Sequence, residues 1–188
     1  MRPSKRDELV ERALTVFYRN GFHVTGMDRL VAETGISKTS MYKHFRTKED
    51  LILAALTLRD KQFRSWLFRR MKELGTTPRG QLIALFDALK EWFAQEEFRG
   101  CMLMKAAAEY QEEADPIHIL TVTHKRLLFS KFSAIAQKAG AADPDSLASG
   151  LLLLKQGAIV AAQLKMTRNP AMDAKASAKI LLADALGQ

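Results

Sequence analysis

Apolar residues recur at helical spacing along most of the chain, and short polar breaks separate the periodic stretches. In the first stretch Leu9, Ala13 and Phe17 share one helical face, and Ser4 with Asp7 three residues later forms a capping sequence before them. The breaks contain glycine or proline, which end and begin helices. We find no convincing alternation of apolar and polar residues of the kind that marks a strand. The pattern therefore predicts an all-α protein.

We expect about nine helices, most of which begin at a capping residue or a proline. Their approximate ranges are 4–20, 26–33, 38–45, 47–74, 78–93, 102–113, 116–139, 144–166 and 172–186. Thr25 is expected to cap the second helix and Ser37 the third. Thr47 to Asp50 reads as the capping box of the fourth.

Residues 25–45 match the pattern of a helix-turn-helix motif, with two short helices joined by a tight turn. Gly35 opens the turn, where the backbone conformation favours glycine, and Ile36 fills the angle between the helices. In the second short helix Met41 and Phe45 lie four residues apart and should point inward. The motif predicts a small N-terminal head that presents one polar helix face.

The outward face of this helix carries hydrogen-bonding and cationic side chains and no acid. Its members are Lys38, Thr39, Ser40, Tyr42, Lys43 and His44. Such a face suits a major groove lined by acceptors and phosphates. The alternative is an ordinary surface helix, which would usually include Glu or Asp. The net charge of +8 agrees with a nucleic-acid partner, although many proteins of this charge bind no polyanion.

The same region resembles the head of the tetracycline-repressor (TetR) family. The matching segments are Gly21-Phe22, Thr25-Gly26-Met27, Leu30-Val31-Ala32, Gly35-Ile36-Ser37-Lys38, Met41-Tyr42-Lys43-His44-Phe45 and Lys48-Glu49-Asp50-Leu51. Together they cover about residues 7–56. Met41 and the pair Gly26-Met27 depart from the residues usual in the family, which bears on which bases are read.

The resemblance implies a head at residues 1–50 that binds DNA and a body at residues 51–188 that binds an effector and dimerises. It implies a repressor that binds a palindromic operator as a homodimer and is released by a small molecule. The implied DNA-contacting residues are Thr25, Lys38, Thr39, Ser40, Tyr42, Lys43, His44 and Lys48. Among them Thr25 and Lys48 should hold phosphates, and Lys43 is the foremost candidate for a base contact.

The stretch Leu147–Leu164 is apolar on almost every side, so it needs cover on two sides. One side is the chain's own core, and we assign the other to a second copy, as the resemblance implies. The expected dimer contacts are Leu151, Leu154, Ala158 and Ala161. The alternative is a central core helix of a monomer. The stretch is long enough to span a membrane, but Lys155 and Gln156 at its middle argue against that.

The resemblance also implies an effector pocket within residues 78–139, for which we expect an apolar or aromatic small molecule. The residues expected to line it are Trp92, Phe93, Met102, Met104, Tyr110, His124 and Phe132. For each of them, His124 included, the simpler interpretation is a core residue. Cys101 lies beside Gly100 near a helix start, where a thiol can sense oxidants or electrophiles. The simpler interpretation there is a small buried residue.

Other functional classes find little support in the sequence. Motifs of nucleophilic hydrolases, zinc peptidases and phosphate-binding loops are missing, so we expect no enzyme, no metal and no cofactor. A single cysteine and a polar N-terminus indicate a cytoplasmic protein. Two alternatives remain: a regulator that senses oxidants or electrophiles through Cys101, and an all-α ligand-binding protein without DNA binding.

Overall fold

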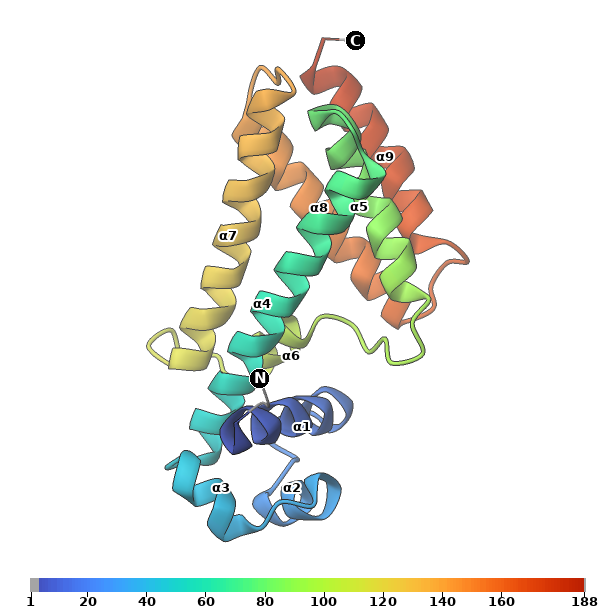
Figure 1. Cartoon of the computed structure of the whole chain (residues 1–188). Coiled ribbons are helices and arrows are strands. Elements are labelled where there is room, and N and C mark those ends of the chain that lie inside the picture. The colour runs from blue at the N-terminus through green and yellow to red at the C-terminus, as the bar shows by residue number, and fades with distance from the viewer. Residues whose placement is uncertain (1–3, 188) are drawn as a thin grey trace. The chain divides into compact units, whose positions relative to one another are not determined.

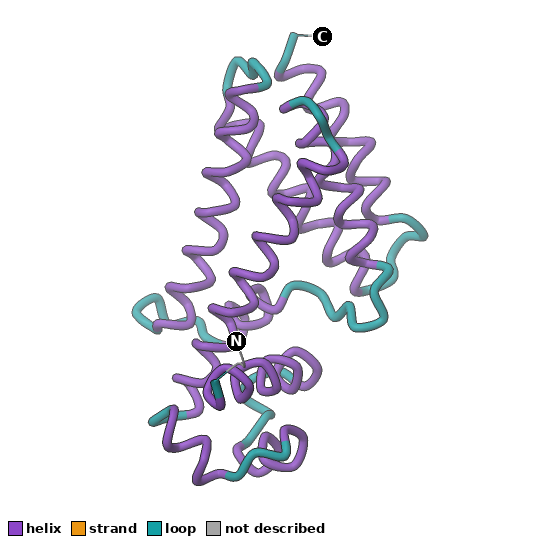
Figure 2. The backbone as a smooth tube through the Cα atoms, in the orientation of Figure 1, coloured by secondary structure: helices purple, strands orange, loops and turns teal. Residues whose placement is uncertain are grey.

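The computed structural model describes residues 4–187, and in that range it is all-helical (Figures 1 and 2). The prediction of an all-α fold with nine helices is confirmed for these residues. The helices are α1 (Lys5–Asn20), α2 (Met27–Thr34), α3 (Lys38–His44), α4 (Lys48–Leu74), α5 (Pro78–Phe93), α6 (Met102–Glu109), α7 (Pro116–Lys138), α8 (Pro144–Gln163) and α9 (Pro170–Ala185).

Most helix starts follow the capping residues expected from the sequence. The Ser4 side chain accepts a hydrogen bond from the Asp7 amide, and Ser37 does the same for Ser40. At α4 the box is reciprocal, because the Asp50 amide donates to Thr47 Oγ1 and the Thr47 amide donates to the Asp50 carboxylate. Local side chains therefore satisfy amides that the first turn of a helix leaves without partners.

Three predicted boundaries were wrong. Thr25 does not cap α2, since Gly26 occupies the cap position with no side-chain hydrogen bond. Helix α6 ends at Glu109 rather than near residue 113, and α8 ends at Gln163 rather than near 166. Beyond α8 the backbone turns at Lys165, which has a φ of 54°. A residue in this left-handed region cannot continue a right-handed helix.

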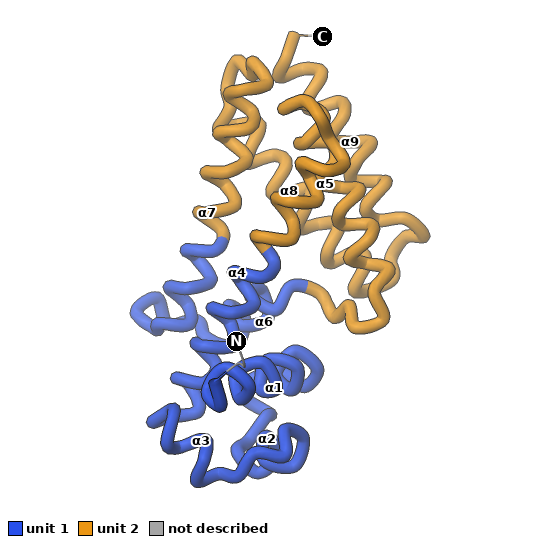
Figure 3. Tube along the Cα trace, in the orientation of Figure 1, with its two compact units in different colours: residues 1–63, 101–124 blue, residues 64–100, 125–188 orange. Residues whose placement is uncertain are grey.

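The chain divides into two compact units, coloured separately in Figure 3. Unit 1 contains residues 1–63 and 101–124, and unit 2 contains residues 64–100 and 125–188. The predicted boundary after residue 50 divides the chain differently, because unit 1 also includes the first part of α4, all of α6 and the start of α7. Local packing thus joins a segment far along the sequence to the N-terminal helices.

The core of unit 1 is aromatic beside the connector between α1 and α2, which consists of residues 21–26. Phe22 is fully buried, and its ring centroid lies 5.7 Å from that of Phe17 and 6.2 Å from that of Tyr110. Leu30 of α2, Met41 of α3 and Ile52 of α4 are also buried. Burial of such side chains is the main favourable term that holds the short helices in place.

Unit 2 is organised around α5, α8 and α9, which pack against one another. By length and composition alone, helix α8 could cross a membrane, and 39% of its apolar stretch is buried inside the protein. Lys155, at its middle, is fully buried. Within the chain, α8 buries residues such as Leu151 and exposes others such as Leu153, and cover by a second copy stays a prediction.

The turn between α2 and α3 gives a stability prediction. Gly35 has a φ of 69° and a ψ of 12°, and a Cβ there would meet only Arg12 at 3.8 Å. Gly35→Ala should lower the free energy of unfolding by about 1 kcal/mol through backbone strain alone. Gly26→Ser is the control, since Gly26 has a φ of −77° and no neighbour within 4 Å, and serine is favoured at a helix N-cap. Urea unfolding that gave equal losses for both variants would contradict this account.

Candidate nucleic-acid interface

Helix α3 is the element that presents the candidate interface, and two inward side chains set its orientation. Met41, within this helix of seven residues, and Phe45, the C-cap residue directly after it, are both buried as predicted. The guanidinium of Arg6 lies 4.9 Å from the centroid of the Phe45 ring and covers it from α1. With this face fixed in the core of unit 1, the opposite face must point to solvent.

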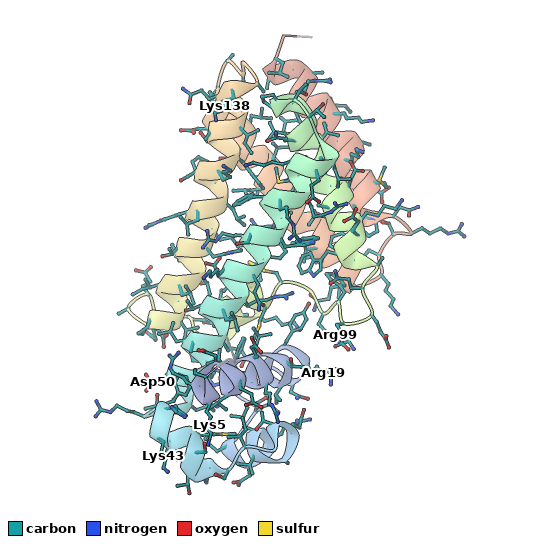
Figure 4. The ribbon with its side chains drawn as sticks, in the orientation of Figure 1. Lys5, Arg19, Lys43, Asp50, Arg99 and Lys138 are labelled. Carbon is teal, nitrogen blue, oxygen red and sulfur yellow. The ribbon has the colours of Figure 1, made fainter. Side chains whose placement is uncertain are left out.

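The outward face of α3 is polar and carries no acid, as the sequence indicates. Lys38, Thr39, Tyr42, Lys43 and His44 are exposed, and Ser40 is half-buried. Figure 4 labels Lys43 on this helix. Lys38 has an acidic neighbour, because its Nζ lies 3.6 Å from a carboxylate oxygen of Asp28 on α2. The face therefore offers several donors to acceptors such as base edges and phosphates.

Two residues expected to hold phosphates are engaged within the protein. Thr25 is fully buried, and its hydroxyl donates to the Gly21 carbonyl at 2.6 Å. The Lys48 ammonium donates to the Phe22 carbonyl at 3.1 Å. Both side chains thus stabilise the connector between α1 and α2. Their contacts with phosphate stay predictions, and Thr25 would have to leave its buried position to make one.

The structure adds a cation that the sequence analysis did not single out. Arg46 is exposed two residues after the end of α3. With Arg6, His44 and Lys61 it lines a groove of about 880 Å³ within unit 1, beside α1 and α4. Its position between two expected contact residues, His44 and Lys48, could have marked it as a further candidate.

The residues expected to line an effector pocket are divided between the units. Trp92, Phe93 and Phe132 belong to unit 2, whereas Met102, Met104, Tyr110 and His124 belong to unit 1. His124 is fully buried, and its Nδ1 lies 2.6 Å from the Asp60 carboxylate, which fits the simpler interpretation of a core histidine. Met104 is 42% exposed in the isolated chain. The role of these seven residues in binding an effector stays a prediction.

Cys101 and the expected dimer residues have distinct environments. Cys101 is only 6% exposed, so a reagent would need a local opening to reach its sulfur. Leu151 and Ala158 are buried within the chain itself, which corrects their assignment to a partner-facing surface, while Leu154 and Ala161 are half-buried. The apolar side chains that α8 exposes are instead Leu153 and Val160. Helical periodicity predicts that α8 is apolar, but it does not predict which of its apolar residues pack inside the chain.

Comparison with known proteins identifies the same region. The family model described as "Bacterial regulatory proteins, tetR family" matches residues 9–55, which contain α2 and α3. The HTH-type transcriptional repressor KstR2 of Mycolicibacterium smegmatis is 34% identical over 88 residues, which span 45% of this chain and 41% of that repressor. The transcriptional regulator AcuR of Cereibacter sphaeroides is 26% identical over 170 residues, or 86% of this chain and 78% of AcuR.

A solved structure extends the likeness to the whole chain. A TetR-family transcriptional regulator from Streptomyces coelicolor superposes with a TM-score of 0.88 and is 27% identical, covering 96% of this chain and 95% of that one. Family model, curated relatives and solved structure agree with the motif that α2 and α3 form. Residues 9–55 therefore match the TetR family of bacterial regulatory proteins, and the whole chain is similar to a TetR-family transcriptional regulator in fold.

Proposed function

We propose that this protein is a cytoplasmic repressor that binds a palindromic operator by inserting α3 into the major groove. The observation that carries the proposal is the acid-free exposed face of α3, held outward by buried Met41 and Phe45. Tyr42 and Lys43 supply donors near the centre of that face. The cations Arg46 and Lys48 both follow α3 in the sequence and supply charge for backbone phosphates.

The proposal includes a homodimer built on α8 and α9. Leu153, Gly157 and Val160 lie at helical spacing along α8, Leu164 is its C-cap residue at the same spacing, and all four are exposed. Leu153 is 69% exposed and Val160 49%, while Ile180 on the neighbouring α9 is 74% exposed. Exposed apolar side chains that gather on adjacent helices favour a protein interface. The small residue Gly157 would let a helix of a second copy approach closely.

The proposal also includes release from DNA by a small apolar or aromatic effector. Its support is the family and the aromatic character of the residues expected to contact the effector. A ligand that binds more tightly to a conformation that cannot bind DNA shifts the protein toward that conformation. The affinity for the operator is lowered as a result. Sensing through Cys101 is the second candidate, favoured by its position directly before α6. Its burial favours the reversible ligand over the chemical signal.

The first test concerns the face of α3. Lys43→Ala and Tyr42→Ala should each weaken binding to a duplex that the wild-type protein enriches from a random pool. A lost base-edge contact costs about 1–3 kcal/mol, or roughly five- to 150-fold in Kd. Lys138→Ala, which removes an exposed lysine at the end of α7, is the control and should bind like the wild type. Fluorescence anisotropy would contradict the proposal if both α3 variants retained full affinity.

The second test concerns the dimer. Wild-type protein at micromolar concentration should sediment with twice the 21.1 kDa mass of one chain. Leu153→Glu should sediment as one chain, because a buried and unpaired carboxylate costs several kcal/mol. Val24→Glu is the control, since Val24 is 75% exposed in unit 1. A wild-type mass of one chain would refute the dimer, as would an unchanged mass for Leu153→Glu.

The third test concerns the effector. A compound that releases a labelled operator duplex in a screen should itself bind more weakly when operator is saturating. The factor must equal its effect on DNA affinity, typically about five- to 150-fold. Calorimetry with and without operator measures it. Equal affinity in both conditions would remove the effector from the proposal. Release by thiol reagents alone, abolished in Cys101→Ser, would favour the second candidate.

A further inference from the structure

A carboxylate from α6 holds the connector between α1 and α2, residues 21–26. The Glu109 side chain accepts hydrogen bonds from two successive amides of the connector, that of Phe22 at 3.2 Å and that of His23 at 2.7 Å. In return, His23 Nε2 donates to the Glu109 carbonyl at 3.0 Å. Glu109 lies 87 residues after Phe22 in the sequence, so this is a tertiary contact and not a local cap.

The backbone of the connector is shaped to receive this carboxylate. Gly21 has a φ of 90° and a ψ of 175°, a conformation that glycine adopts readily and other residues avoid. A Cβ on Gly21 would lie 3.2 Å from Glu109 Oε1, tighter than an ordinary contact. Hydrogen bonds from amides to an ionised carboxylate are stronger than those to a neutral acceptor. Glu109 thus satisfies two amides that no helix of the head satisfies.

Two further side chains, from Tyr110 and Lys48, also contact the connector. The ring of Tyr110 stacks on His23 with centroids 4.8 Å apart and meets Phe22 edge-on. Burial first, and then the negative charges of Glu49, Glu109 and Asp115, raise the pKa of Tyr110 to about 12, so this ring stays neutral. Lys48 of α4 donates to the Phe22 carbonyl. Glu109 of α6 therefore binds two amides of the connector, and Lys48 of α4 binds one of its carbonyls.

We propose that Glu109 is a positioning residue for DNA binding, whose carboxylate fixes the connector and with it the orientation of α2 and α3. The proposal rests on the proposed function. It gives α6 a direct hold on the head, in addition to the covalent path along α4. Since Met102 and Met104 of α6 are among the residues expected to meet an effector, a shift of α6 would act on the connector through Glu109.

The experiment compares Glu109→Ala and Glu109→Gln with the control Glu113→Gln, an exposed glutamate four residues later. In the protein without DNA, the amides of Phe22 and His23 should exchange hydrogen at least about tenfold faster in Glu109→Ala than in wild type. Glu109→Gln, which keeps a neutral acceptor, should show a smaller increase. Affinity for the duplex enriched by the wild type should fall at least about fivefold in Glu109→Ala, measured well below the melting temperature of each variant.

The outcomes separate this proposal from the proposed function. Unchanged exchange at Phe22 and His23 would overturn it whether or not the protein binds DNA. Faster exchange with unchanged affinity would reduce Glu109 to a structural residue and would also overturn it. If Glu109→Ala fails to fold, Glu109→Gln decides by the same two measurements. A wild-type protein that enriches no duplex would refute the proposed function, and the exchange rates would still report whether Glu109 holds the connector.

Discussion

The burial of Met41 and Phe45 is the constraint on which the candidate interface depends. A helix of seven residues is too short to persist in water, because nucleation costs more than so few hydrogen bonds return. Helix α3 therefore exists because its inner face packs in the core of unit 1 and because Ser37 caps its first turn. The buried side chains of Met41 and Phe45 also determine which side chains face outward. The packing that stabilises α3 therefore also orients the candidate interface.

The second constraint is the connector before α2, which unites distant parts of the sequence in unit 1. Gly21 turns the backbone, and the Phe22 side chain is buried in the core. The Glu109 carboxylate accepts hydrogen bonds from the amides of Phe22 and His23. Because these contacts join α6 to α1 and α2, the compact unit that contains the head also contains residues 101–124. The division into head and body by sequence position is thus coarser than the division by packing.

Local patterns predicted the helices and the inner face of α3, because capping chemistry and helical periodicity are local properties. They failed where the answer depends on tertiary packing. Thr25 resembled a cap, yet it is buried with its hydroxyl on the Gly21 carbonyl. Leu151 and Leu153 are equally apolar, and only the packed structure distinguishes the buried residue from the exposed one. Glu109 gave no signal at all, since nothing in its neighbourhood in the sequence points to residues 22 and 23.

The central claim is that the polar face of α3 contacts DNA bases in a major groove. A crystal structure of the protein on a duplex that it selects from a random pool tests this most directly. The account predicts two protomers whose α3 helices lie in successive major grooves, about 34–36 Å apart, with Tyr42 and Lys43 within hydrogen-bond distance of the duplex. A complex in which another surface holds the DNA and α3 remains in solvent would contradict it.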